Sequence, residues 1–393
     1  MIRITETENG KVRGLPAADP RITSFKGIPF AAPPVGVNRW RAPQPAENWD
    51  GIRDCFAFAP ISVQDTPGIG TDIYCREWHV DPEIPMSEDC LYLNVWTNAK
   101  KTDEKLPVLV WYFGGGFQWG YPAEMEFDGE RLARRGIVVV TVNYRLGAFG
   151  FLAHPQITAE QPDAPCNFGS LDQQAGLRWV KRNIANFGGD PDNITIAGQS
   201  AGGGSVMAQM ACPDHAGLFQ KAVVFSGMIA FPYAPNNFFI PKNLEEAGKL
   251  GVELFDALGV KTLEEARKLD ADFIRSTYSD LRNQGRMMFG IVNDGKFNTQ
   301  DPLDAFVKVT RNRVPVLAGN TADEFKDCIF AKDDDDFREK AKKLFGDDTE
   351  KFLSIPGVCE KAEGFQGIPD AIGMTGNAYA PVSSPELGVK IAF

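Results

Sequence analysis

Histidine is nearly absent from this sequence, which has only three in 393 residues: His79, His154 and His215. Histidine is the side chain that most often serves as a general base. A mechanism that needs a histidine base therefore has only three candidate positions in this sequence. His79 lies in a polar segment, His154 in a turn, and His215 in a loop after a helix of small residues. We expect all three to be ordinary surface or turn residues.

Cysteine pairs with a recognisable spacing are also lacking, although the chain contains seven cysteines. No C-x-x-C pair and no His/Cys spacing typical of a metal site occurs, which argues against a structural metal centre. An odd number of cysteines cannot all pair within one chain. The sequence therefore predicts reduced thiols. They are Cys55, Cys75, Cys90, Cys166, Cys212, Cys328 and Cys359.

Basic residues are outnumbered by acidic ones: the sequence has 41 Lys and Arg and 52 Asp and Glu, which gives a net charge of −11 at pH 7. This balance argues against nucleic acid or an anionic membrane as a partner and favours neutral or cationic small molecules. No apolar run reaches the roughly 18 residues of a membrane span, and Met1–Gly10 holds no apolar core of a signal peptide. We expect a cytoplasmic protein.

Short β-branched runs alternate with longer helical patterns, which predicts an α/β fold with a central, mostly parallel twisted sheet flanked by helices. The nearly continuous apolar character of these runs suits strands that are covered on both faces. The proline-rich first hundred residues predict an irregular outer layer over an antiparallel sheet edge. The expected buried strands are Leu106–Tyr112, Ile137–Asn143, Ile194–Ala197, Ala222–Phe225 and Val314–Ala318.

Helical spacing extends over Gln173–Phe187 and Ala201–Ala211, and Gly188–Pro191 is a stop signal between them. A charged helical pattern from about Pro241 to Asn283 predicts a helical cap inserted between sheet strands, within residues 241–290. The acidic run at residues 333–336 predicts a solvated loop or a helix N-terminus.

The most informative segment is Gly198-Gln-Ser-Ala-Gly202, a G-x-S-x-G pattern between a β-branched run and a small-residue helix. In a nucleophile elbow the serine occupies the strained apex of a strand-to-helix turn, and flanking glycines let the neighbouring backbone pass close by. The pattern therefore predicts that Ser200 is a catalytic nucleophile. A structural serine that caps a helix is the alternative.

Three successive glycines in Phe113–Phe117 follow a predicted strand. Without Cβ atoms, their backbone N–H groups can converge on one point, as an oxyanion hole requires. We assign Gly115 and Gly116 as donors, together with the N–H of Ala201 beside the expected nucleophile. A plain glycine-rich turn, or a phosphate loop without its Lys-Ser/Thr, is the alternative.

A catalytic acid is expected after the nucleophile, and Glu324 lies just beyond the Val314–Ala318 strand, where a carboxylate can orient an imidazole. Asp323 is the local competitor. No histidine follows Glu324. His215 is near Ser200 in sequence, but an intervening helix of about ten residues would carry it roughly 15 Å away.

These motifs resemble the type-B carboxylesterase family of α/β-hydrolases, which includes bacterial carboxylesterases and cholinesterases. The resemblance extends from Gly10 to at least Phe330 and implies one catalytic domain over residues 1–393, hydrolysis of a small-molecule carboxylic ester through an acyl-serine, and no cofactor. The family motifs match Ser200 as nucleophile, Glu324 as acid, and Gly115, Gly116 and Ala201 as oxyanion donors. Further signatures are Phe25–Pro34, Ser87–Asn94, Val142–Gly147 and Leu171–Gln174.

The chain departs from the family pattern at several points. Gln199 replaces the usual glutamate, which removes a negative charge that would favour cationic substrates, and Phe113 replaces the usual His or Tyr. Secreted members pair the cysteine equivalent to Cys90 with one aligned near Ser62, so that bridge cannot form here, which indicates a bacterial cytoplasmic origin.

The resemblance further implies that members continue beyond the end of this chain, Phe393, with the segment that carries the catalytic histidine. We therefore expect a C-terminally incomplete catalytic domain that lacks this histidine. A truncated or catalytically silent α/β-hydrolase that acts as a binding module is the alternative.

Overall fold

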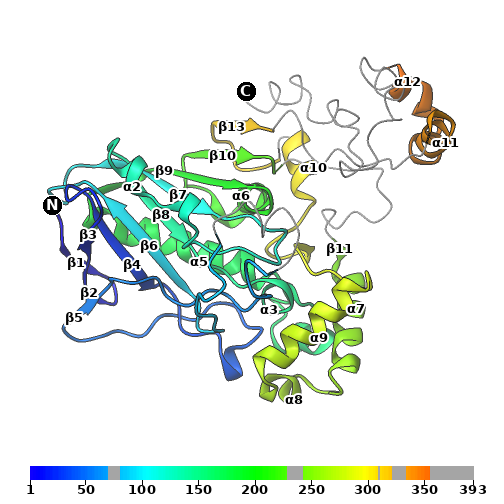
Figure 1. Ribbon diagram of the computed structural model, residues 1–393, viewed down its shortest axis with the longest axis horizontal. Coiled ribbons are helices and arrows are strands. Elements are labelled where there is room, and N and C mark those ends of the chain that lie inside the picture. The colour runs from blue at the N-terminus through cyan, green and yellow to red at the C-terminus, as the bar shows by residue number, and fades with distance from the viewer. Residues whose placement is uncertain (70–79, 228–241, 309, 321–332, 355–393) are drawn as a thin grey trace.

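The computed structural model describes residues 1–69, 80–227, 242–308, 310–320 and 333–354 (Figure 1). Its centre is an eight-stranded sheet in the order β13-β10-β9-β7-β8-β6-β4-β3. The five strands from β13 to β8 pair in parallel, and the remaining pairs are antiparallel. The sequence-based expectation of a mostly parallel sheet with an antiparallel edge is confirmed.

The parallel strands lie where the apolar runs predict them. They are β7 (Leu106–Tyr112), β8 (Val138–Val142), β9 (Gly189–Gln199), β10 (Lys221–Phe225) and β13 (Val316–Gly319). The main difference is β9, which begins before its apolar run and includes Gly189–Pro191 rather than stopping there. Gly189 pairs with Leu106, and the register then shifts before Val108 pairs with Ile194, so an irregular ladder absorbs the proline.

The antiparallel edge is built by the first hundred residues. It contains β3 (Leu15–Pro16), β4 (Thr23–Pro29) and β6 (Tyr92–Thr97). A separate three-stranded sheet is formed by β1 (Ile4–Thr7), β2 (Gly10–Arg13) and β5 (Ile52–Asp54).

Helices cover both faces of the central sheet, as the side chains of β8 demonstrate. All five residues of β8 are buried. Val139 packs in a cluster with Ala133 of α2 (Glu130–Ala133), whereas Val140 packs in the cluster that holds Leu177 of α5 (Phe168–Asn183). Because successive strand residues point to opposite faces, α2 and α5 lie on opposite sides of the sheet.

The helix expected at Ala201–Ala211 is present with those bounds as α6 and packs against β9 and β10. The helix expected at Gln173–Phe187 begins earlier, at Phe168, and its last turn is the 3₁₀ helix η3 (Ile184–Phe187). Gly188 then ends it with φ 81°, a left-handed conformation that glycine adopts without strain.

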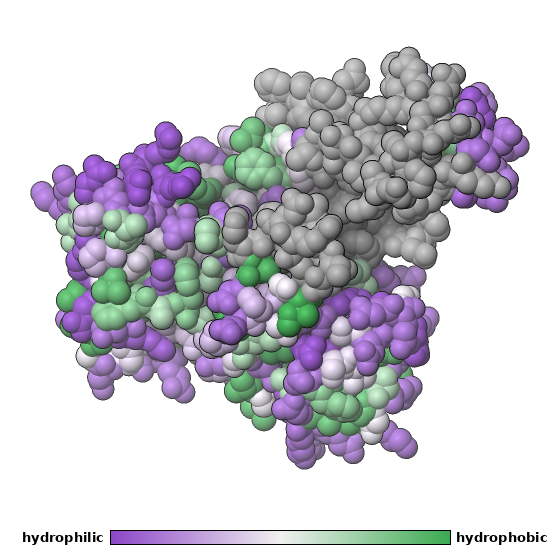
Figure 2. All heavy atoms as spheres, in the orientation of Figure 1, coloured by the Kyte–Doolittle hydropathy of each residue, from purple (hydrophilic) through white to green (hydrophobic). Residues whose placement is uncertain are grey.

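Three helices occupy the segment for which the sequence predicts a cap: α7 (Leu244–Ala257), α8 (Leu263–Lys268) and α9 (Ala271–Asn283). Capping boxes start α7 at Asn243 and α8 at Thr262. Figure 1 shows the three helices grouped beside α3 (Gly147–Phe151), and Figure 2 shows many hydrophilic residues on their outer surface. The short strands β11 (Lys242–Asn243) and β12 (Val292–Asn293) pair in parallel and bracket the segment.

The acidic run at residues 333–336 is the start of α11 (Asp334–Phe345), where Asp333 accepts a hydrogen bond from the backbone N–H of Asp336. Among the described residues, no helix is long and apolar enough to cross a membrane, and no cluster of three acidic, histidine or cysteine side chains could hold a metal ion. The remaining helices are η1 (Gly36–Asn38), η2 (Met125–Phe127), α4 (Pro155–Glu160), η4 (Pro213–His215), α10 (Pro302–Val307), α11 (Asp334–Phe345), η5 (Gly346–Asp348) and α12 (Thr349–Leu353).

Candidate active site

Ser200 occupies the turn between β9 and α6 with φ 56° and ψ −124°, a backbone conformation that is uncommon for any residue with a side chain. Its backbone N–H donates to the carbonyl oxygen of Phe225 at 2.9 Å, which ties the turn to the neighbouring strand β10. Its own carbonyl oxygen accepts from Gly204 N–H at 2.8 Å and so starts the helix. The strained turn is therefore held from both sides.

The two glycines that flank Ser200 are required by close backbone contacts. A Cβ on Gly198 would lie 2.3 Å from the carbonyl oxygen of Gly202, and one on Gly202 would lie 2.1 Å from that of Tyr112. No real Cβ atom approaches so closely. The spacing of the G-x-S-x-G motif thus follows from how tightly β9 and α6 pack against the end of β7.

The triple-glycine loop lies directly beside this elbow. A Cβ on Gly114 would be 3.1 Å from the Cβ of Ser200. Gly115 and Gly116 have φ values of 104° and 62°, which few other residues adopt. In the described part of the chain, the backbone N–H groups of Gly115, Gly116 and Ala201 donate to no acceptor.

Buried hydrogen bonds hold the ends of the glycine loop. At its start, the Tyr144 hydroxyl donates to the carbonyl oxygen of Phe113 at 2.7 Å, and the two rings stack with centroids 4.3 Å apart. At its end, Gln64 accepts from Gly120 N–H at 2.9 Å and donates to the Gly120 carbonyl oxygen at 3.0 Å. The loop is consequently fixed before any substrate binds, which is what preorganised donors require.

The model of the carboxylesterase family matches residues 2–366 of the sequence. The chain belongs to the carboxylesterase family. This carboxylesterase-family chain is 34% identical over 374 residues to a fumonisin B1 esterase of Sphingopyxis macrogoltabida, covering 94% of itself and 65% of that protein. It is 37% identical over 332 residues to a para-nitrobenzyl esterase of Bacillus subtilis, covering 82% of itself and 63% of the relative.

Solved structures agree with the family. A carboxylesterase of Geobacillus stearothermophilus has a TM-score of 0.73 at 33% identity, over 88% of this chain and 69% of that one. A PNB esterase has a TM-score of 0.75 at 31% identity, over 100% of this chain and 77% of that one. The expected α/β-hydrolase fold is confirmed. The chain spans about two thirds of the length of the curated relatives named above, at 65% and 63%.

Two of the three histidines of this carboxylesterase-family chain are described, and both are buried rather than exposed. The backbone N–H of Gln156 donates to Nδ1 of His154, whose ring stacks on Phe255 with centroids 4.1 Å apart. Nδ1 of His215 lies 3.0 Å from the Gln209 carbonyl oxygen, and its Nε2 contacts the Gln174 amide. Burial lowers the pKa of both, that of His215 to about 4.

His215 lies beyond the C-terminal end of α6, whereas Ser200 lies at its N-terminal end. A helix of this length carries the two about 15 Å apart. The sequence-based expectation that these histidines lie at the surface is wrong, because both rings are buried. Glu324, its competitor Asp323, and His79 lie outside the described residues.

Two family signatures meet in a buried ion pair that the sequence alone did not assign. Arg145, from the Val142–Gly147 signature, donates two side-chain hydrogen bonds to Asp172 at 2.8 and 2.7 Å and a backbone one at 3.0 Å. The side chains are 4% and 0% exposed. The pair thus joins the chain after β8 to helix α5.

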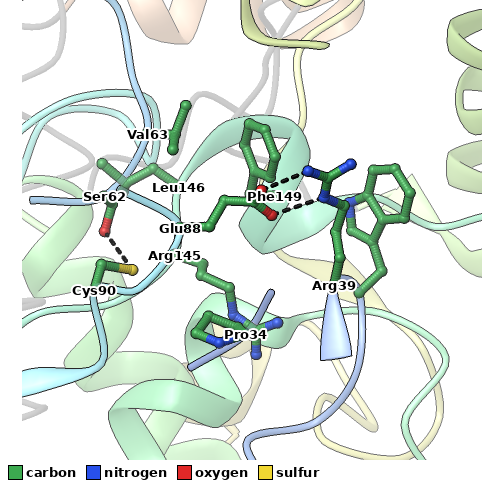
Figure 3. Close-up of a pocket in the computed structure, with 10 residues that line it drawn as sticks. Pro34, Arg39, Ser62, Val63, Glu88, Cys90, Arg145, Leu146 and Phe149 are labelled. Carbon is green, nitrogen blue, oxygen red and sulfur yellow. Dashed lines mark hydrogen bonds and ion pairs between the residues drawn. The ribbon is translucent and has the colours of Figure 1, made fainter. Parts of the chain in front are cut away.

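Figure 3 shows a neighbouring small pocket in which Arg39 pairs with Glu88 of another signature, and Ser62 points toward Cys90. Ser62 Oγ lies 3.5 Å from Cys90 Sγ, which agrees with the family-based alignment of the two positions. The four described cysteines, Cys55, Cys90, Cys166 and Cys212, are free and buried. Burial raises the pKa of the Cys90 thiol to about 12, so it stays protonated near neutral pH.

Proposed function

We propose that this protein hydrolyses carboxylic esters of small molecules, with Ser200 as the nucleophile and with Gly115, Gly116 and Ala201 as oxyanion-hole donors. The observation that carries the proposal is the strained Ser200 turn beside a fixed glycine loop. Within the described residues, the N–H groups of Gly115, Gly116 and Ala201 at this turn have no acceptor. Its relatives of 34% and 37% identity are named esterases, which supports the same reaction class.

In the proposed reaction, the Ser200 oxygen attacks the ester carbonyl carbon and a histidine base takes its proton. The carbonyl oxygen becomes an oxyanion that accepts hydrogen bonds from the three N–H groups. The base returns the proton to the leaving alcohol, and water later attacks the acyl-serine in the same way. Glu324 would orient the imidazole and balance its charge.

We assign the base to none of the three histidines of this chain. His215 lies at the wrong end of α6, and burial keeps its pKa near 4, which is too low for a base that must accept a proton near neutral pH. A catalytic domain without the base would retain the oxyanion hole and substrate binding, which in a comparable triad enzyme leave about 10³–10⁴-fold acceleration over water.

Two further assignments accompany the proposal. Gln199 contributes no negative charge beside Ser200. Gln199 also borders the glycine loop, since a Cβ on Gly114 would lie 3.2 Å from the side-chain amide oxygen of Gln199. We therefore assign neutral esters as substrates. The free cysteines and the Ser62–Cys90 contact fit a bacterial cytoplasmic protein, because secreted relatives would bridge that position. The helices α7–α9 are assigned as the cap.

The nucleophile assignment is tested on this chain joined to a C-terminal segment that supplies the histidine base, and the same extended protein serves in all the labelling and kinetic tests below. A fluorophosphonate probe, which bonds covalently to an activated serine, is followed by peptide mapping. We expect one adduct, at Ser200, its loss in Ser200→Ala, and its retention in Ser354→Ala, a control at an exposed serine. Hydrolysis of p-nitrophenyl acetate is measured in parallel. An adduct at another serine refutes the assignment, and binding of an ester without any adduct supports a silent binding module.

A further inference from the structure

A chain of hydrogen bonds, most of them buried, connects helix α9 to the glycine loop. The Tyr278 hydroxyl donates to Oε1 of Gln118 at 2.6 Å. Nε2 of Gln118 then donates to the carbonyl oxygen of Gly116 at 3.1 Å and to that of Phe289 at 2.6 Å. The Phe289 N–H completes the network by donating to the Tyr278 hydroxyl at 3.0 Å.

This network has little freedom to rearrange. Gln118 is 3% exposed and Tyr278 5%. The Tyr278 ring stacks on Phe289 with centroids 5.1 Å apart, and a Cβ on Gly147 would lie only 3.0 Å from the same ring. Burial raises the pKa of Tyr278 to about 12, so its hydroxyl remains a donor throughout the pH range in which esters are assayed.

The glycine loop needs such support because its own residues restrict the backbone least. The peptide plane that contains the Gly116 N–H is fixed through the carbonyl oxygen of Gly115, which accepts from Gln118 N–H at 2.9 Å and Trp119 N–H at 3.0 Å. The next plane is fixed through the Gly116 carbonyl oxygen by the Gln118 side chain. Gln118 thus contacts both planes around Gly116.

Helix α9 contacts the same loop at a second point. The guanidinium of Arg282 lies over the Trp119 ring, 4.6 Å from its centre. Arg282 and Arg275 each form an ion pair with Asp65 at 2.7 Å. The helix is therefore held in place independently of the Tyr278 hydroxyl.

We propose that Gln118 and Tyr278 are positioning residues for the oxyanion hole, through which helix α9 sets the direction of the Gly116 N–H. The inference rests on the proposed function. Neither residue touches the reacting atoms, so their loss acts on the rate of acylation rather than on ester binding. Misplacement of a reacting group by about 1 Å can lower a rate by about 10²-fold, and a single lost bond in this network is expected to cost about tenfold.

The test compares Tyr278→Phe, which keeps the stacked ring, with Tyr121→Phe. Tyr121 is a matched control because it is also buried and its hydroxyl takes no part in this network. That hydroxyl accepts a hydrogen bond of 2.8 Å from the backbone N–H of Asp81. For p-nitrophenyl acetate we expect Tyr278→Phe to lower kcat about tenfold with KM changed less than about twofold. Gln118→Ala should lower kcat similarly, and the double variant should lose no more than the worse single variant, because both act through one network.

Hydrogen exchange of the 113–120 peptide and thermal unfolding accompany the kinetics, so that loop order and overall stability are read separately. Faster exchange in this peptide together with lower kcat supports the inference. Equal kcat in Tyr278→Phe and Tyr121→Phe, or a fully additive double variant, overturns it. A parent protein that is supplied with the histidine base and still neither hydrolyses the ester nor labels at Ser200 instead refutes the proposed function.

Discussion

The tight packing behind the nucleophile elbow leads to a prediction about two glycines in the same helix. A Cβ on Gly202 would lie 2.1 Å from the carbonyl oxygen of Tyr112 and 2.8 Å from that of Phe113. A Cβ on Gly204 would meet only the Phe117 ring, at an ordinary 3.7 Å. Gly202→Ala should therefore disturb the site, and Gly204→Ala should not.

The expected magnitudes follow from these distances. Because Cβ atoms essentially never come within 3.0 Å of another atom, Gly202→Ala must separate α6 from the end of β7 by about 1 Å. Overpacking of this kind lowers the free energy of unfolding by about 1–3 kcal/mol. A displacement of that size can slow a reaction by about 10²-fold. Gly204→Ala should instead stabilise the protein by about 0.5–1 kcal/mol, because alanine is the better helix former.

The assay is the second-order rate constant for fluorophosphonate labelling of Ser200, measured beside urea unfolding followed by tryptophan fluorescence. We expect Gly202→Ala to label about 10²-fold more slowly than the parent protein at a urea concentration where both are folded. Equal labelling rates and equal stability for Gly202→Ala and Gly204→Ala would show that the elbow can relax freely, and the packing argument would be wrong.

Three further predictions concern stability. The pKa of His215 is about 4 in the folded state and about 6.5 in the unfolded state. As the pH falls, the unfolded state therefore takes up a proton first, and the free energy of unfolding should drop by about 3 kcal/mol between pH 7 and pH 4. In His215→Gln urea unfolding should lack this part of the pH dependence, and an unchanged slope would contradict the assigned burial. Asp172→Asn should lower the free energy of unfolding, measured in urea, by about 3–5 kcal/mol, because it leaves the Arg145 charge buried and unpaired. The control Asp54→Asn, which breaks a half-exposed ion pair, should change this free energy little. Ser62→Cys should form a disulfide with Cys90 under oxidising conditions and raise stability by about 3–4 kcal/mol, lost on reduction; a thiol titration that finds no bridge would refute the inferred proximity.

Much of the fold could be predicted from the sequence because the decisive patterns are local. Buried parallel strands are apolar at nearly every position, so β7, β8 and β10 are recognisable without their neighbours. Helix α6 was predicted with its exact bounds because it starts at the elbow and ends before Pro213. The start of β9 was missed because Gly189–Pro191 joins the sheet through an irregular pairing with β7 that has no sequence signal.

The support of the candidate site could not be predicted, because it depends on contacts between distant parts of the chain. Gln118 and Tyr278 are brought together by the packing of α9 on the glycine loop, and neither stands in a recognisable motif. Gln64 likewise reaches Gly120 from a segment with no regular structure. The motifs identified the groups that would carry the reaction, whereas the residues that orient them emerged only from the three-dimensional arrangement.

The burial of the histidines could not be predicted from the sequence either. A sequence can count three histidines, but it cannot distinguish a solvated ring from one packed inside the core. In the structure, both ring nitrogens of His215 are engaged, and the ring packs edge-on against Phe297 with centroids 5.7 Å apart. A ring held so tightly can neither swing toward Ser200 nor accept a proton near neutral pH, because burial disfavours its charged form. Proximity of Ser200 and His215 in the sequence therefore argues nothing about catalysis, since the rigid helix α6 that separates them also keeps them apart.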